Sequence, residues 1–248
     1  MKRAWCVGAC ACVVLCASFD LSAQRRGPST PPGSPALPAP PAQPSAQPSP
    51  SRSRGRLFAP QDLGLLEGPD RDEWQKPDQI MDALKIADGS IVAELGAGGG
   101  WFTIRLARRV QQNGHVYAED IQAPMIAAIG RRVQRENLTN VTTVLGTPTD
   151  PRLPSGIDAA LIVDSYREME ISPSDPVTLL RNVARSLKPH GRIGIVDFTP
   201  GAGGPGPAAD QRVNPEAVIA AAASAGLQLM SREAVEPFQY LLVFGKAR

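Results

Sequence analysis

A glycine-rich stretch preceded by an acidic residue is the part of this chain best suited to chemistry. The apolar run Ile91-Val92-Ala93 leads into Glu94, and glycines then stand at positions 96, 98, 99 and 100. This order predicts a buried strand, a tight turn and a helix that begins near Trp101. Glycine lets the backbone turn at positive φ and lets a ligand approach the main chain closely. Such a loop at the end of a buried strand is typical of sites that hold an adenosine-containing cofactor.

The spacing of the glycines distinguishes between two kinds of cofactor. The dinucleotide fingerprint requires glycine at the first, third and sixth positions of the loop. Gly96 and Gly98 fit the first two, but the sixth position is Trp101. A pyrophosphate needs open helix N–H groups and close helix–strand packing, and an indole at this position opposes both. The spacing therefore disfavours a dinucleotide.

The pattern that is present, acidic-x-Gly-x-Gly-x-Gly, resembles the first motif of the class I S-adenosylmethionine-dependent methyltransferases. The resemblance extends over nearly all of residues 57–248. S-adenosylmethionine is a cationic sulfonium compound without phosphate, so a nearby carboxylate suits it better than it would suit a pyrophosphate. The resemblance implies S-adenosylmethionine as cofactor and a first group of binding residues: Glu94, Gly96, Ala97, Gly98 and Gly100.

Two later segments resemble the same family at the expected order and spacing. An acid at the end of the second strand, about 20 residues after the glycine loop, binds both ribose hydroxyls in such sites. Asp120 matches this position best, and Glu119 is the alternative. After the third strand the family places a polar contact to adenine, and the usual acid is missing there. The resemblance implies Thr147 in this role, with Asp150 as the alternative.

The segment Asp164-Ser165-Tyr166-Arg167-Glu168 follows the fourth strand. In the family it supports the methionine side of the cofactor, here through Asp164, and faces the methyl acceptor. The catalytic candidates are therefore Asp164, Tyr166 and Glu168. Many relatives carry Tyr-His-Glu at this point, and a histidine can act as a general base. Arg167 cannot, because a guanidinium does not lose its proton in proteins.

Two further segments, one before and one after these motifs in the sequence, are expected to border the candidate site. Trp74 lies in the segment just before the core, where we expect its ring to stack on the cofactor or its sulfonium group. The alternative is that Trp74 is a packing anchor. The loop 200–207 is rich in glycine and proline and is expected to form a lid or a wall of the acceptor site.

The elements that must position these residues alternate between strand and helix patterns. We expect strands at 91–95, 115–119, 141–145, 159–163 and 192–198, and helices at 101–110, 124–136, 175–187 and 215–225. Two final strands, 227–234 and 238–244, are predicted to form a hairpin around Pro237. This predicts an α/β fold with a doubly wound, seven-stranded, mostly parallel sheet and a C-terminal antiparallel hairpin strand. It resembles the Rossmann-like methyltransferase fold and differs from the dinucleotide-binding sheet.

The N-terminal residues are predicted to lie outside this domain. Residues 1–23 combine the basic start Met1-Lys2-Arg3 with an apolar run and a small residue, Ala23, at the cleavage site, which is the pattern of a signal peptide. We therefore expect export to the periplasm or secretion. The apolar run is short for a membrane span, so no stable transmembrane anchor is expected. Lipidation at Cys10 is the disfavoured alternative, because too little apolar sequence precedes it.

Composition narrows the remaining possibilities. Residues 24–56 are rich in proline, serine and alanine and are predicted to form a disordered linker to a methyltransferase domain at 57–248. All four cysteines precede position 24 and the chain has two histidines, so no metal site is expected. The net charge of +2 comes from arginines near the N-terminus, and acidic residues outnumber basic ones after residue 57. This argues against a nucleic-acid partner.

Three functions remain open. The favoured one is a methyltransferase that acts on a small or cell-envelope acceptor. The second is a catalytically impaired protein that binds S-adenosylmethionine or a nucleoside, which Arg167 suggests. The third is an NAD(P)-dependent oxidoreductase, which Trp101 and the closing hairpin disfavour. The sequence does not predict the acceptor, the atom methylated or the oligomeric state.

Overall fold

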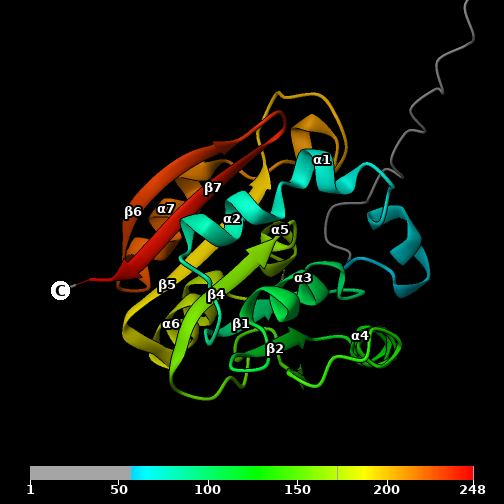
Figure 1. The fold of residues 1–248 in the computed structure, drawn as a ribbon. Coiled ribbons are helices and arrows are strands. Elements are labelled where there is room, and N and C mark those ends of the chain that lie inside the picture. Colours follow the sequence, from blue (N-terminus) through cyan, green and yellow to red (C-terminus); the bar gives the residue numbers. More distant parts are fainter. Residues whose placement is uncertain (1–56, 172, 248) are drawn as a thin grey trace, which may run out of the picture. The chain divides into compact units, whose positions relative to one another are not determined.

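The computed structural model describes residues 57–171 and 173–247 (Figure 1). The predicted signal peptide and linker lie outside the described residues. Within the described part, the model contains no helix that is both long enough and apolar enough to cross a membrane.

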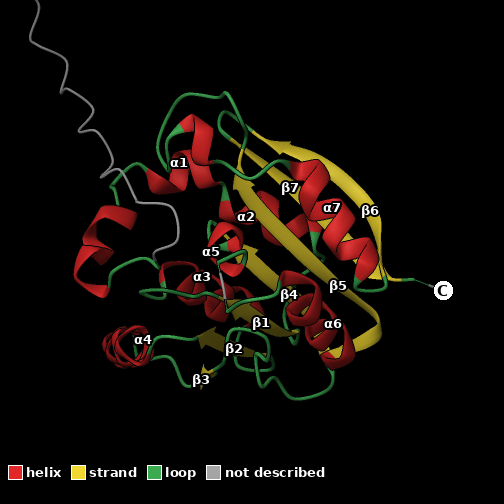
Figure 2. Cartoon of the chain, turned by 180° about the vertical axis from the view of Figure 1, so that it is seen from behind, coloured by secondary structure: helices red, strands yellow, loops and turns green. Residues whose placement is uncertain are grey.

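A single seven-stranded sheet forms the centre of the fold, in the order β3-β2-β1-β4-β5-β7-β6 (Figure 2). Strands β1 to β5 pair in parallel, and β7 runs antiparallel between β5 and β6. This confirms the predicted sheet and its closing hairpin. The bounds are β1 Ile91–Leu95, β2 His115–Asp120, β3 Val141–Leu145, β4 Ile157–Val163, β5 Leu187–Phe198, β6 Leu227–Val235 and β7 Gln239–Lys246.

Helices cover both faces of the sheet (Figure 2). Residues of α2 and α3 share one core cluster with Val92 and Val116, and α4 packs its Ile129 on Ala118 of the same face. Residues of α5, α6 and α7 share the cluster on the opposite face with Ala93. The bounds are α1 Arg71–Gln75, α2 Pro77–Ala83, α3 Trp101–Val110, α4 Ala123–Arg135, α5 Tyr166–Met169, α6 Pro176–Ser186 and α7 Pro215–Ser224, with short 3-10 turns at Pro60–Leu66 and Ala209–Gln211.

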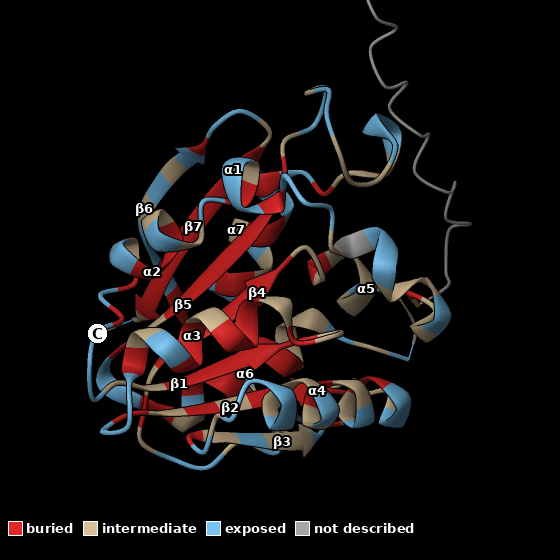
Figure 3. Cartoon of the chain, turned by 45° about the vertical axis from the view of Figure 1, so that its right-hand side comes forward, coloured by how far each residue is buried: buried red, intermediate tan, exposed pale blue. Residues whose placement is uncertain are grey.

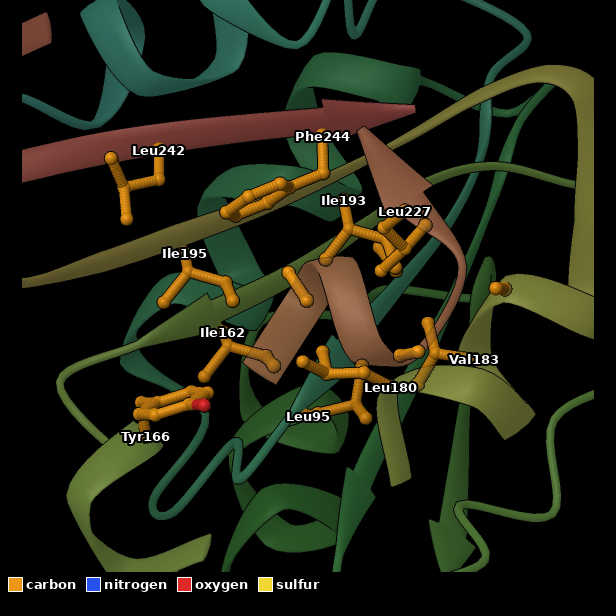
Figure 4. Close-up of a cluster of buried hydrophobic side chains, with 14 of the residues drawn as sticks. Leu95, Ile162, Tyr166, Leu180, Val183, Ile193, Ile195, Leu227, Leu242 and Phe244 are labelled. Carbon is orange, nitrogen blue, oxygen red and sulfur yellow. The ribbon is translucent and has the colours of Figure 1, made fainter. Parts of the chain in front are cut away.

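The central strand β4 is buried on both faces, as its continuous apolar run predicts. Ala160 and Ile162 point into one core cluster, and Ala159 and Leu161 point into the other. Figure 4 shows the first cluster, where Ile162 lies among side chains from β1, β5, α5 and α6. Burial is high along β1, β4, β7 and the second half of β5, and lower on the edge strands β3 and β6 (Figure 3). The doubly covered centre fixes the carboxyl ends of the parallel strands, where the candidate residues lie.

Several predicted boundaries differ from the structure. Strand β5 begins at Leu187 and not at the expected residue 192, and its pairing with β4 is irregular between Ile157 and Ala159. Helices α1 and α5 and the turn Pro60–Leu66 were not predicted. These elements are four to seven residues long, too short to show a helical hydrophobic period.

Candidate functional site

The glycine loop connects β1 to α3 and adopts left-handed backbone at three positions. The φ angles are 66° at Gly96, 57° at Gly98 and 80° at Gly100. A Cβ atom at Gly96 would lie only 2.6 Å from Oγ of Ser165, the residue that follows the end of β4 by two positions. The loop therefore closes on the segment after β4, and only glycine fits at position 96.

Two carboxylates at the end of β2 hold the loop in place. The N–H of Gly98 donates to Oδ2 of Asp120 at 3.0 Å, and the N–H of Gln122 donates to Oδ1 at 2.9 Å. The N–H of Gly96 donates more weakly to Oε2 of Glu119 at 3.4 Å. Burial raises the pKa of Asp120, and burial together with the charge of Asp120 raises the pKa of Glu119 to about 8. Hydroxyl donors of a ligand would stabilise this pair.

Glu94 is buried at the end of β1. The hydroxyl of Thr103, on α3, donates to its Oε2, so the carboxylate joins the strand to the helix that follows the loop. Burial raises the pKa of Glu94 to about 7, and the bond from Thr103 and the charge of Arg71 act in the opposite direction.

A buried arginine that the sequence patterns did not single out lies across the site from the loop. Arg71, in α1, donates to Oδ2 of Asp164 at 3.1 Å and to Oε1 of Gln75 at 3.0 Å. Its guanidinium lies 4.2 Å from the ring centre of Trp101, at the start of α3. No local motif marks Arg71, because all but one of these partners lie far away in the sequence.

Arg71 belongs to a closed ring of four polar side chains. The amide of Gln75 donates to Oε1 of Gln239 at 2.8 Å, and the amide of Gln239 donates to Oδ1 of Asp164. Asp164 itself has a φ of 58°, a conformation that costs a non-glycine residue about 1–3 kcal/mol and clusters at functional sites. The four-residue ring fixes Asp164 between α1 and β7, at the carboxyl end of β4.

These residues line a cleft at the carboxyl ends of β1, β2 and β4. Its outer part is bounded by Gly96, Glu119, Asp120, Thr147 and Ser165. Its inner part is bounded by residues that include Glu94, Ala97, Gly98, Asp164 and Glu168, together with Arg71 and the turn Pro60–Leu66. Most residues predicted from the sequence are thus brought to one cleft.

Three predicted residues lie elsewhere. Gly100 forms the N-cap of α3, where an added Cβ would contact Ile129. Trp74 does not line the cleft; it lines the neighbouring pocket and packs on Phe198, with ring centres 5.8 Å apart. Tyr166 begins α5 but is 1% exposed and lies in the core beside Ile162 (Figure 4). The expectation that Tyr166 faces the acceptor is therefore corrected, because its ring lies in the core. The contact of Trp74 with Phe198 agrees with the alternative given for it, and its stacking on the cofactor stays a prediction.

The acidic side chains of the cleft fit S-adenosylmethionine better than a dinucleotide. Buried Glu94, Glu119 and Asp120 all lie against the glycine loop, and a pyrophosphate would meet three carboxylates there. Ribose hydroxyls, in contrast, would donate hydrogen bonds to the pair on β2.

The sequence comparisons cover the central half of the chain. Residues 92–191 match a family model described as a methyltransferase domain. An uncharacterized methyltransferase of Mycobacterium tuberculosis is 31% identical over 121 residues, which is 48% of this chain and 44% of that protein. A demethylmenaquinone methyltransferase of Listeria monocytogenes is 25% identical over 126 residues, which is 50% of this chain and 51% of that protein. The chain thus spans about half the length of the curated relatives that it matches.

Solved structures share the fold. A SAM-dependent methyltransferase from Aquifex aeolicus has a TM-score of 0.71 at 22% identity and covers 76% of this chain and 98% of its own. The glycopeptide N-methyltransferase MtfA, in complex with S-adenosylmethionine, has a TM-score of 0.56 at 16% identity, with 69% of this chain and 87% of that chain covered. Taken with the sheet order and the glycine loop against its acidic partners, the matched segment and these relatives support a class I S-adenosylmethionine-dependent methyltransferase family for this chain.

Proposed function

We propose that this protein transfers a methyl group from S-adenosylmethionine to a small or cell-envelope acceptor. The single observation that carries the proposal is the cleft, in which the glycine loop faces two buried carboxylates on β2. When bound, S-adenosylmethionine supplies a methyl group already activated by its positively charged sulfur. The protein then has to position two reactants, which by itself lowers the barrier substantially.

Each part of the cleft has a role in this proposal. Asp120, assisted by Glu119, accepts hydrogen bonds from the ribose hydroxyls. Thr147 lies at the adenine end, where its hydroxyl also closes a turn with Asp150. Arg71 and Asp164 hold the charged amino-acid end, since they carry opposite charges and line the inner part.

A second pocket favours methyl transfer over binding alone. It adjoins the cleft and shares Arg71, Asp164 and Glu168 with it. An acceptor in this pocket would therefore lie next to the inner end of the cleft. Arg167 lines the same pocket, so the arginine that replaces the family's histidine contributes charge there instead of acting as a base. The names of the relatives do not point to one shared acceptor. The acceptor of this chain therefore has to be inferred from the residues that line its own second pocket.

Isothermal titration calorimetry on the full chain tests which cofactor the protein binds. We expect saturable binding of S-adenosylmethionine and of S-adenosylhomocysteine, and no measurable binding of NADH, because three carboxylates surround the loop. Asp120→Ala is expected to weaken S-adenosylmethionine binding at least tenfold. It removes the carboxylate that accepts hydrogen bonds from the ribose hydroxyls, and with it the hydrogen bond from the N–H of Gly98. Glu73→Gln removes an exposed carboxylate of α1 and serves as the matched control. Binding of NADH without S-adenosylmethionine would overturn the proposal.

Transfer itself needs a separate experiment. The full chain is incubated with S-adenosylmethionine labelled in the methyl group and with fractions of a cell extract. We expect label in a small-molecule or envelope fraction. Tight donor binding with no label in any fraction would instead support a binding protein without turnover.

We further propose that the mature protein acts outside the cytosol, because residues 1–23 have the pattern of a signal peptide. Cell fractionation followed by N-terminal sequencing tests this. The expected first residue of the exported protein is Gln24. An intact Met1 on cytosolic protein would contradict export and would leave the methyltransferase proposal untouched.

A further inference from the structure

The pocket next to the cofactor cleft is built from segments far apart in the sequence. Helix α1 contributes Trp74, the end of β5 contributes Asp197 and Phe198, and the loop after β5 contributes Pro205 and Pro207. Figure 1 shows this loop running beside α1 at the carboxyl end of the sheet. The loop thus forms one wall of the pocket.

Asp197 is the unusual residue of this pocket. It is 3% exposed, and its Oδ1 accepts a 2.7 Å hydrogen bond from the N–H of Phe198. Its Oδ2 is buried and has no hydrogen-bond partner among the described residues. Buried polar atoms are nearly always paired, and an unpaired one raises the free energy of the folded state. A buried carboxylate oxygen without a partner, in the lining of a pocket, indicates a ligand that donates a proton or a hydrogen bond.

The charges around the pocket indicate the sign of that ligand. Its lining contains four acidic side chains and two basic ones, and one of the basic groups, Arg71, is already held by Asp164 at 3.1 Å. An anionic ligand would therefore be repelled, and a cation would be attracted. The indole of Trp74 adds a surface that attracts cations. The acidic residues are Asp70, Asp164, Glu168 and Asp197, and the basic ones are Arg71 and Arg167.

We propose that this pocket is the acceptor site and that it takes an amine carried on an apolar body, with Asp197 as the group that receives the amine's proton. This inference rests on the proposed methyl transfer and adds its substrate class. The amine enters as its ammonium ion, which first gives one N–H proton to Oδ2 of the ionised Asp197 and becomes a neutral amine with a lone pair. The new C–N bond then forms as the S–C bond of the donor breaks, and the bonding pair stays on sulfur.

The protonation behaviour of Asp197 suits this role. Burial and the nearby charge of Asp164 raise its pKa to about 7, so the carboxylate can take a proton near neutral pH. Glu170 acts in the same direction and Arg167 in the opposite one. Arg212 and Tyr240 also lie close enough to Asp197 to interact with its charge. We therefore expect amine binding to strengthen as the pH rises from 6 to 8, since the ionised carboxylate holds the ammonium group.

Three matched probes test the proposal by calorimetry on the full chain, with and without saturating S-adenosylhomocysteine. They are phenethylamine, 2-phenylethanol and 3-phenylpropionate, which share the ring and differ in charge. We expect phenethylamine to bind at least tenfold more tightly than 3-phenylpropionate. Asp197→Asn is expected to weaken phenethylamine at least tenfold, to leave 2-phenylethanol within twofold, and to remove the pH dependence between 6 and 8. Glu73→Gln, which removes an exposed charge of α1, is expected to change none of these values.

Trp74→Leu provides a second, independent variant, because it alters the wall of the pocket without altering a buried charge. It is expected to weaken both phenethylamine and 2-phenylethanol, and to weaken the amine more, because the indole attracts the ammonium group. Equal binding of the amine and the carboxylate, or an unchanged amine affinity in Asp197→Asn, would overturn the proposal. Failure of S-adenosylhomocysteine to bind would overturn the proposed function instead. The amine titration without S-adenosylhomocysteine would still determine whether the pocket binds an amine.

Discussion

Replacing Gly96 by alanine is expected to lower the affinity for S-adenosylmethionine at least a hundredfold. Two effects act together at this position. The φ of 66° is strained for any side chain with a Cβ atom, and that atom would lie 2.6 Å from Oγ of Ser165. The loop must therefore shift away from the segment after β4, and the cleft between them loses its shape. Calorimetric titration of the variant with S-adenosylmethionine measures the loss.

Gly130→Ala is the matched control for this variant. Gly130 lies inside α4, and a Cβ atom there meets nothing within 4 Å, so alanine is expected to leave the affinity unchanged and to raise stability by about 0.5–1 kcal/mol. Adding Ser165→Gly to Gly96→Ala removes the colliding side chain and is expected to restore part of the affinity. Normal binding by Gly96→Ala alone would show that the loop does not contact the cofactor closely.

Replacing Glu119 by glutamine is expected to make the protein more stable at pH 8 but not at pH 4. The folded-state pKa of Glu119 is raised to about 8 by burial and by Asp120. A group with a raised pKa favours folding while it is protonated, and this contribution is lost as the pH rises from the unfolded pKa toward the folded one. Glutamine carries no charge, so it avoids that loss. One pKa unit corresponds to about 1.4 kcal/mol, and the pKa of Glu119 is raised from 4.5 to about 8, so a gain of roughly 2–4 kcal/mol at pH 8 is expected.

Urea unfolding of the wild type and the variant at pH 4, 6 and 8 measures this effect. The difference in unfolding free energy is expected to grow with pH and to be near zero at pH 4. Glu73→Gln, which removes an exposed acid on α1, is expected to show no such trend. A gain of equal size at all three pH values would mean that Glu119 does not change its charge over this range.

The fold could be predicted because its main signals are local. The run that became β4 is apolar on both faces, and the two helices that follow β1 and β2 have clear amphipathic patterns. The hairpin that closes the sheet was marked by two strand patterns around Pro237. Such patterns report burial directly, so element type and order follow from them.

The site was only partly predictable, because some of its contacts have no local signature. Glycines and acids at the ends of β1 and β2 fall within one strand–loop–helix unit, and the cleft does contain them. The partners Arg71 and Asp164 are 93 residues apart, and Gln75 and Gln239 are 164 apart. Asp197 looked like an ordinary strand residue, since only the structure shows that Oδ2 is unpaired. Tyr166 has a residue type suited to a site, but its ring lies in the core. Trp74 packs on Phe198 and also lines the second pocket.

The four-residue ring around Asp164 has a consequence for the order in which the protein is made. Gln239 follows Asp164 by 75 residues, and Arg71 precedes it by 93. During synthesis the chain emerges from its N-terminus, so the strained residue at the end of β4 lacks its β7 partner until that strand has been added. The ring around Asp164 is therefore completed only when the last hairpin docks onto β5.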